Sequence, residues 1–459
     1  MPTRITKQRF DAFTFGVRGG GEATSWQDVS YWSTHSGEAL AALFYVERAD
    51  AFLGALFLRD DHHRFRPFPP LVPFRTKRAG EASIIEKLTD IEGREAPLNR
   101  PEIRGRPGVD LFTVTHDAPL NPIFENIRDS EYSKAAKEML TEIAHWFEDR
   151  DGNFAREFQT TGTSARLWEL YLFRVFRDLG FDIDRSTSTP DFTLIKNELK
   201  LFVEATTANS GDQKYVDLTA GPAPRPDKFR SFIENDMPII FGSPLFTKQK
   251  KAYWEKDPVK GHPFAIAIAD FHAPGSMTWS HTALSTYLYG VSVERVAGAD
   301  GKDIAVAKPL KMHTKGEKKI PSGFFSQPGT EHIAAVIFSN AGTKAKFTRM
   351  GTLAGFGNVD MAVRRAGVLS NPEPGALEGI RFDINIESPD YHERWRDELE
   401  IYHNPNALIP WPDEALIPEA THFKEQGGEL VWRGEPFRVL TSSTLVEKRP
   451  PYSEADNAA

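Results

Sequence analysis

Two short, continuous apolar runs constrain the fold of this chain more than any other feature. They span Pro263–Ala269 and Ile333–Ser339. A short run without polar interruptions is typical of a strand buried inside a sheet, whereas a half-exposed strand alternates apolar and polar residues. We therefore expect at least two buried strands in the core.

The segments that precede the first run complete the pattern of an α/β core. The strongest helical periodicity lies between Thr163 or Ser164, either of which is expected as the N-cap, and Gly180, which is expected to stop the helix. A helix, a hairpin and a second helix ahead of a buried strand are typical of α/β proteins. The predicted elements are a helix over Thr163–Leu179, strands over Pro190–Ile195 and Leu199–Thr207, and a helix over Phe246–Trp254.

The chain has 459 residues, about three times the usual length of one domain, so two or three domains are expected. Apolar runs between Trp26 and Phe68 predict an N-terminal unit, and several short runs after residue 380 predict further strands. The expected division is an N-terminal α/β or β-rich unit of unknown role (1–128), a core (129–350), a strand-rich extension (351–448) and a disordered tail (449–459).

Composition excludes several classes of protein. The chain has no cysteine, so disulfides, thiolate metal sites and cysteine nucleophiles are excluded, and any metal must bind oxygen or imidazole. The N-terminus lacks the apolar segment of a signal peptide, and no apolar run approaches the ~18 residues of a membrane span. We expect a soluble, cytoplasmic protein with no membrane partner.

The charge is unevenly distributed. The chain has 56 Lys and Arg against 64 Asp and Glu, a net charge of −8, but the stretch from Lys248 to Arg365 is +8 and the remainder is −16. A basic region on an acidic body suits a phosphate backbone, and a solvated lysine-rich face is the alternative interpretation. The basic clusters are Lys248, Lys250 and Lys251; Lys311, Lys315, Lys318 and Lys319; and Lys344, Lys346 and Arg349.

Three carboxylates lie on elements that can converge. Glu169 is on the first predicted helix, Asp191 follows Pro190 at the start of one strand, and Glu204 is on the next strand. Because successive side chains of a strand point to opposite faces of the sheet, Glu204 and Thr206 lie on the face opposite the aliphatic residues that pack the core. Because a short turn joins the two strands, Asp191 and Glu204 are expected to be neighbours.

Carboxylates gathered at one edge of a sheet predict a site for a hard divalent cation, Mg²⁺ or Mn²⁺. Asp and Glu supply anionic oxygen ligands, and water completes the octahedron. Such an ion polarises a phosphodiester, orients water and lowers its pKa. The chemistry that this arrangement favours is phosphodiester hydrolysis.

The order of these residues along the chain resembles that of the PD-(D/E)xK restriction-endonuclease-like nuclease superfamily. Glu169 precedes Pro190-Asp191, and Glu204-Ala205-Thr206 follows 13 positions after the first acid. The expected helix and buried strand over residues 248–269 fit the same pattern. The resemblance covers residues 160–271, under a quarter of the chain.

The resemblance implies a restriction-endonuclease-like mixed sheet flanked by helices, to which the N-terminal α/β unit and the C-terminal strands are additions. It also implies that Asp191 and Glu204 bind the metal, that Glu169 completes the shell from the helix, and that Thr206 occupies the position of the catalytic lysine. Thr206 has no charge, and loss of such an electrostatic group typically costs ~10²–10³ in rate when nothing replaces it.

Three other lysines are candidates to replace the motif lysine. Lys200 lies four residues from Glu204, roughly 13 Å along a strand, and is a poor substitute. Lys214, in the segment after the strand, and Lys248, on the later helix, could each reach the site from another element. A second metal ion is the remaining alternative.

The expected function is that of a Mg²⁺-dependent endonuclease, related to restriction or defence, that acts on nucleic acid, with DNA favoured over RNA. Glu169, Asp191, Glu204 and Thr206 are its expected site residues. The alternatives are a catalytically inactive nuclease-fold module that binds nucleic acid or protein, and a hydrolase whose chemistry lies in the C-terminal strands. Self-association into a homodimer is left open.

Two further motifs are assigned to ordinary structure. Asp60–His63 has metal-binding residue types, but four polar residues between two apolar runs predict a turn. Gly19–Gly21 lacks the Lys-Ser/Thr pair of a phosphate-binding loop. Neither motif is expected to carry chemistry.

Overall fold

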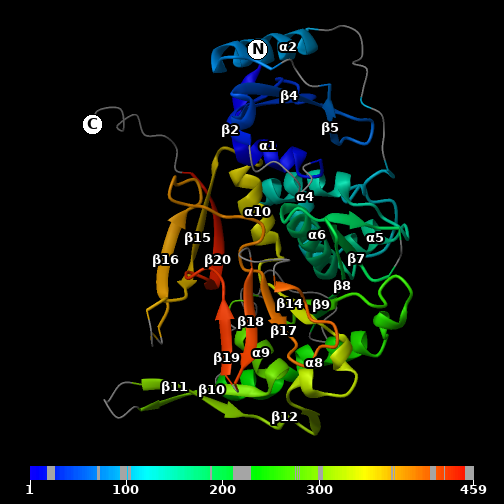
Figure 1. Cartoon of the computed structure of the whole chain (residues 1–459), viewed down its shortest axis with the longest axis vertical. Coiled ribbons are helices and arrows are strands. Elements are labelled where there is room, and N and C mark those ends of the chain that lie inside the picture. Colours follow the sequence, from blue (N-terminus) through cyan, green and yellow to red (C-terminus); the bar gives the residue numbers. More distant parts are fainter. Residues whose placement is uncertain are drawn as a thin grey trace.

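A computed structural model shows a mixed α/β protein that contains several sheets (Figure 1). The predicted loop at Gly19–Gly21 and the predicted tail, apart from Arg449, lie outside the described residues. None of the described helices is long and apolar enough to cross a membrane. The structure describes residues 1–17, 26–69, 73–93, 101, 105–186, 189–209, 229–273, 275, 278, 280–297, 303–373, 376, 378–413, 420–427 and 429–449.

An eight-stranded mixed sheet forms the centre of the protein, in the order β19-β18-β17-β14-β9-β8-β7-β6. The two apolar runs of the sequence are β9 and β14, which pair in parallel and are buried along their whole length, as predicted. β8 also runs parallel to β9, and β7 is antiparallel to β8. The strands are β6 (Asp182–Asp184), β7 (Phe192–Lys196), β8 (Leu199–Ala208), β9 (Phe264–Asp270), β14 (Ala335–Phe338), β17 (Glu400–His403), β18 (Thr421–Gln426) and β19 (Glu429–Arg433).

Helices cover both faces of this sheet because its central strands are apolar on both sides. On β8, Leu201 and Val203 pack into one hydrophobic layer, and Phe202 packs into the other. The first layer contains α3 (Pro122–Asp129), α4 (Lys134–Trp146), α5 (Phe154–Gln159), α6 (Thr163–Asp178) and α10 (Lys344–Leu353). The second contains α8 (Met237–Gln249) and α9 (His281–Tyr289), and the short α7 (Phe229–Ser231) precedes α8.

The N-terminal unit is a five-stranded antiparallel meander between two helices, at one end of the molecule (Figure 1). Alternate residues of its middle strand face opposite helices: Ala41 and Leu43 pack in the cluster with α2, and Leu40 and Ala42 pack in the cluster with α1. The elements are β1 (Thr3–Ile5), α1 (Lys7–Thr14), β2 (Trp26–Ser33), β3 (Ala39–Val46), β4 (Ala51–Arg59), β5 (Phe65–Phe68) and α2 (Lys77–Glu92). Asp60–His63 forms the predicted turn between β4 and β5.

The C-terminal strands divide between two sheets. β17, β18 and β19 extend the central sheet, whereas a separate antiparallel sheet has the order β16-β15-β20. Two hairpins lie at the end of the molecule opposite the N-terminal unit (Figure 1). The separate sheet contains β15 (Met361–Leu369), β16 (Ile380–Asn385) and β20 (Val439–Lys448), and the hairpins pair β10 (Val291–Ala297) with β11 (Asp303–Pro309) and β12 (Met312–Lys315) with β13 (Lys318–Pro321).

Two helix predictions were wrong in detail. The N-cap of α6 is Gly162, because the Thr163 hydroxyl donates to the Phe158 carbonyl instead of capping the helix. α8, at Met237–Gln249, begins nine residues before the predicted helix begins and ends five residues before it ends. Pro238 is tolerated in its first turn, but Pro244 is inside the helix, where sequence rules place a break.

The third basic cluster is not a surface patch. Lys346 and Arg349 of α10 are buried, and both donate to Glu393 Oε1, each at 2.8 Å. Arg365 of β15 lies 3.4 Å from the same oxygen and 2.6 Å from Glu398. Burial opposes the ionisation of Glu393, but these cations hold its pKa well below its usual range. The cluster therefore joins the C-terminal sheet to α10.

Replacing Glu393 with alanine should lower the free energy of unfolding by about 3–5 kcal/mol, because three cations lose their shared partner. Since the pKa of Glu393 is lowered, its contribution should be complete above the unfolded pKa of about 4.3 and should be lost as the pH falls further. Urea unfolding at pH 7 and pH 3.5 measures both effects. Glu447→Ala, at an exposed position on β20, is the control and should change stability by less than about 0.5 kcal/mol; equal effects of the two variants would contradict the assignment.

A candidate active site on the β7–β8 hairpin

A tight turn sets the register of the hairpin that carries the predicted acids. Asn197 adopts a left-handed backbone conformation with φ of 53°, which asparagine tolerates better than most residues. The strands then pair from Lys196 with Leu199 to Phe192 with Val203. This register brings Asp191, just before β7, to the level of Glu204 on β8.

Asp191 and Glu204 contact each other's strands through hydrogen bonds. The backbone N–H of Asp191 donates to Glu204 Oε2 at 3.2 Å, and the backbone N–H of Ala205 donates to Asp191 Oδ2 at 2.8 Å. The side chain of Glu204 is almost fully buried. The two carboxylates are thus fixed side by side on the hairpin, as the sequence predicts.

A lysine and a tyrosine from beyond β8 hold the second oxygen of Glu204. Lys248, in the last turn of α8, donates its ammonium to Glu204 Oε1 at 2.6 Å. Tyr253, in the 3₁₀ turn that follows α8, donates its hydroxyl to the same atom at 2.5 Å. Burial and this hydrogen bond raise the pKa of Tyr253, so the phenol remains a donor at neutral pH.

Glu169 lies in the same electrostatic neighbourhood, on α6 at the opposite face of the sheet. Its Oε1 is 2.5 Å from Arg166 Nη1, one turn earlier on the helix. Burial, followed by the charge of Asp191, raises the pKa of Glu169 to about 8, against the opposing effect of Arg166. At neutral pH this side chain therefore favours the protonated form.

The Asp191–Glu204 pair has the character of a cation site. Burial, followed by the charge of Glu204, raises the pKa of Asp191 to about 6 against the opposing charge of Lys248, so Lys248 does not fully offset the negative charge of the pair. Mg²⁺ is commonly bound by one or two carboxylates and keeps several waters, and Asp191 and Glu204 fit that arrangement. Across the described residues, however, no three His, Asp or Glu side chains are grouped so that they could hold a metal, so Glu169 does not complete a three-residue shell here.

The candidate replacements for the motif lysine differ in their position relative to Glu204. Thr206 is half-buried and lies two residues beyond Glu204, where its hydroxyl adds no charge. Lys200 has its ammonium 5.2 Å from the ring of Phe202, and Lys214 lies outside the described residues. Lys248 is the one of these lysines whose described contacts include Glu204.

Sequence reasoning missed two of the residues that surround the acids. Arg166 carries a weak signal, because its spacing of three from Glu169 is that of neighbours on a helix. Tyr253 carries none, because it reaches Glu204 from a turn 49 residues later in the chain. Lys256, in the same segment, donates to the Thr189 hydroxyl at 2.8 Å and so contacts the chain just before Asp191.

No family model, curated protein or solved structure matches this chain. The residues of the site form a buried pair of carboxylates, a contacting ammonium from another element and a phenol that orients one of the acids.

Replacing Lys248 with methionine tests whether Mg²⁺ and the ammonium of Lys248 compete for Glu204. In EDTA the variant should lose about 3 kcal/mol of stability, because a buried carboxylate loses its ammonium partner. Added Mg²⁺ should then raise the melting temperature of the variant more than that of the wild type. Thermal unfolding in EDTA and in MgCl₂ at matched ionic strength measures this, with exposed Lys251→Met as the control; identical Mg²⁺ responses of wild type and Lys248→Met would contradict a cation site at this pair.

Proposed function

We propose that this protein is a Mg²⁺-dependent phosphodiester hydrolase that acts on nucleic acid, with a restriction-endonuclease-like core. The observation that carries the proposal is the adjacency of Asp191 and Glu204 with the ammonium of Lys248, 2.6 Å from Glu204. Two carboxylates and one lysine are the functional groups that the PD-(D/E)xK resemblance requires. Here the lysine comes from α8 instead of from position 206.

The order of elements supports the same proposal. α6 precedes the β7–β8 hairpin, α8 follows it, and the buried β9 then pairs in parallel with β8. This is the helix, hairpin, helix and strand order expected from the resemblance. The helices lie on both faces of the mixed sheet.

The chemistry follows from the charges of the site. Mg²⁺ held by Asp191 and Glu204 would supply a Lewis acid for the phosphodiester and its attacking water. Hydrolysis forms a bond from the water oxygen to phosphorus and breaks one P–O ester bond, and negative charge grows on the phosphoryl oxygens as it proceeds. Lys248 supplies positive charge beside that centre, and Tyr253 fixes the orientation of Glu204.

The segment that encloses Glu204 is also rich in exposed lysines. Between Lys248 and Lys260 the chain contacts the site through Lys248, Tyr253 and Lys256. Exposed ammonium groups attract a polyanionic backbone and neutralise its phosphates. The exposed lysines of this segment are Lys250, Lys251, Lys256 and Lys260.

A second candidate function has its own supporting observation. Lys248 already neutralises Glu204, and Glu169 favours its protonated form, so the site can be stable without a divalent ion. The protein would then be an inactive nuclease-fold module that binds nucleic acid or another protein. Saturable stabilisation by Mg²⁺ favours the enzyme, and no stabilisation favours the module.

Cleavage assays should identify which element supplies the catalytic lysine. Asp191→Asn and Lys248→Met should each reduce cleavage at least ~10²-fold, because each removes charge at the reacting centre. Thr206→Val should change the rate by less than about threefold, because it removes no charge. Plasmid, linear and single-stranded DNA and RNA with Mg²⁺ or Mn²⁺ are the substrates; wild-type activity that survives Asp191→Asn would contradict the proposal.

The salt dependence of nucleic-acid binding should show whether the exposed lysines between Lys248 and Lys260 contact phosphates. In the Asp191→Asn background, Lys251→Ala and Lys260→Ala should each lower the slope of log K against log salt by about 1, because each removes a phosphate contact. Fluorescence anisotropy with a labelled duplex measures this slope. Lys87→Ala, at an exposed position on α2 of the N-terminal unit, is the control, and a slope that changes equally in all three variants would contradict the assignment.

A further inference from the structure

A cavity of about 600 Å³ lies between the C-terminal sheet and the starts of β17 and β18 in the central sheet, and the Asp191–Glu204 pair does not line it. Its walls come from β15, β16 and the start of β20 on one side, and from residues 390–400 with β17 on the other. Its volume is in the range of small-molecule sites. The residues of the carboxylate pair do not line it, so it requires a separate explanation.

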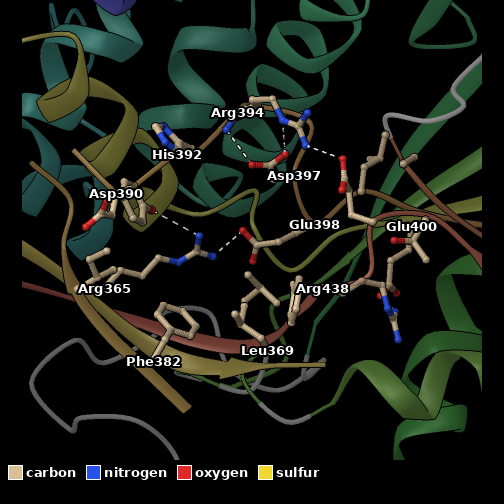
Figure 2. A pocket seen from close by; sticks show the side chains of 18 of the residues that line it. Arg365, Leu369, Phe382, Asp390, His392, Arg394, Asp397, Glu398, Glu400 and Arg438 are labelled. Carbon is tan, nitrogen blue, oxygen red and sulfur yellow. Dashed lines mark hydrogen bonds and ion pairs between the residues drawn. The ribbon is translucent and has the colours of Figure 1, made fainter. Parts of the chain in front are cut away.

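One wall of this cavity is apolar. Leu369 of β15 and Phe382 of β16 share the face of their sheet that also carries Arg365, because the register pairs Gly367 with Phe382 and Arg365 with Ile384. Phe437 is 54% exposed at the mouth. Figure 2 shows Leu369 and Phe382 on the same side of the meeting point of Arg365 and Glu398. Leu369 and Phe382 are half-buried, and such partly exposed apolar side chains in a concavity favour a ligand with an apolar body.

The rest of the lining is predominantly acidic. The described residues of the lining include six carboxylates, three arginines and one histidine, but the side chain of Asp383 lies on the other face of its sheet, where it pairs with Arg364. The carboxylates are Asp383, Asp390, Asp397, Glu398, Glu400 and Glu435, and the basic residues are Arg365, Arg394, Arg438 and His392.

Each arginine of the lining is already neutralised. Arg365 is 2.6 Å from Glu398, and Arg438 is 3.1 Å from Glu400. Arg394 is shared between Asp397, at 2.8 Å, and Glu435, at 3.4 Å (Figure 2). The acidic groups are therefore in excess.

Among the described residues of the lining, Asp390 is a carboxylate without an ion-pair partner. It is exposed, and within the described part of the chain its carboxylate makes no hydrogen bond or ion pair. Asp383, by contrast, is paired with Arg364 at 2.8 Å. A carboxylate beside an apolar wall suits a cation carried on an apolar body.

We propose that this cavity binds a small organic cation, an amine or a guanidinium on an apolar or aromatic body. The apolar body packs against Leu369, Phe382 and Phe437, and the cationic group lies near Asp390. An anionic ligand is disfavoured, because every arginine of the lining is already committed to a carboxylate. The site is independent of the proposed nuclease chemistry.

This inference is tested with phenethylamine and phenylacetate, which have a similar shape and opposite charge, and with agmatine, an aliphatic cation. Phenethylamine and agmatine should each raise the melting temperature of the full chain, by about 1.5 °C at ten times the Kd and further at higher concentration, whereas phenylacetate should not. A blocked Phe-Arg dipeptide presents the same cation on a polypeptide; tighter binding of the dipeptide than of the free amines identifies a peptide as the source of the same chemistry. Stabilisation by phenylacetate, or by none of the cations, would overturn the proposal.

Two variants at exposed positions test whether the probes bind in the cavity. Asp390→Asn and Phe437→Ala should each weaken phenethylamine binding roughly threefold to fivefold, because one removes an exposed charge contact and the other removes apolar wall. Both positions are exposed, so the fold should be unaffected. Asp117→Asn, an exposed aspartate outside the cavity, is the control; equal affinities of all three variants and the wild type would overturn the assignment.

Discussion

A buried carboxylate requires a counter-charge, and this constraint governs two regions of the molecule. Glu204 is buried between the helical layers and receives an ammonium from Lys248. Glu393 is fully buried and gathers Lys346 and Arg349. In each case the cation comes from a distant part of the sequence, so charge neutralisation fixes the packing of α8 and α10 as well as the ionisation of the acids.

The two regions differ in whether their charges balance. Around Glu393 the cations outnumber the buried acid and lower its pKa, which is the behaviour of a structural ion-pair network. Around Asp191 and Glu204 the pKa of Asp191 is raised to about 6, which is the behaviour of a site whose negative charge Lys248 does not fully offset. This contrast separates the part of the protein that stabilises the fold from the part to which we assign chemistry.

The sequence predicted what local patterns determine. Strands β9 and β14 follow from continuous apolar runs, and the adjacency of Asp191 and Glu204 follows from a short turn that fixes register. The position of α8 was missed, because Pro244 inside a helix contradicts the local rule. The role of Lys248 was one of several open alternatives, because period and spacing cannot show which distant side chain reaches a strand. The division of the C-terminal strands between two sheets is likewise a property of tertiary packing.

The central claim is that Asp191 and Glu204 together hold a divalent cation beside Lys248. The most direct test is a crystal structure of the full chain soaked in Mn²⁺, with anomalous data. The account predicts an anomalous peak about 2.2 Å from oxygens of both carboxylates, with the ammonium of Lys248 moved away from Glu204 Oε1. A map without a peak at this pair, in which Lys248 still contacts Glu204, would contradict the claim and leave the lysine as the permanent counter-charge of the site.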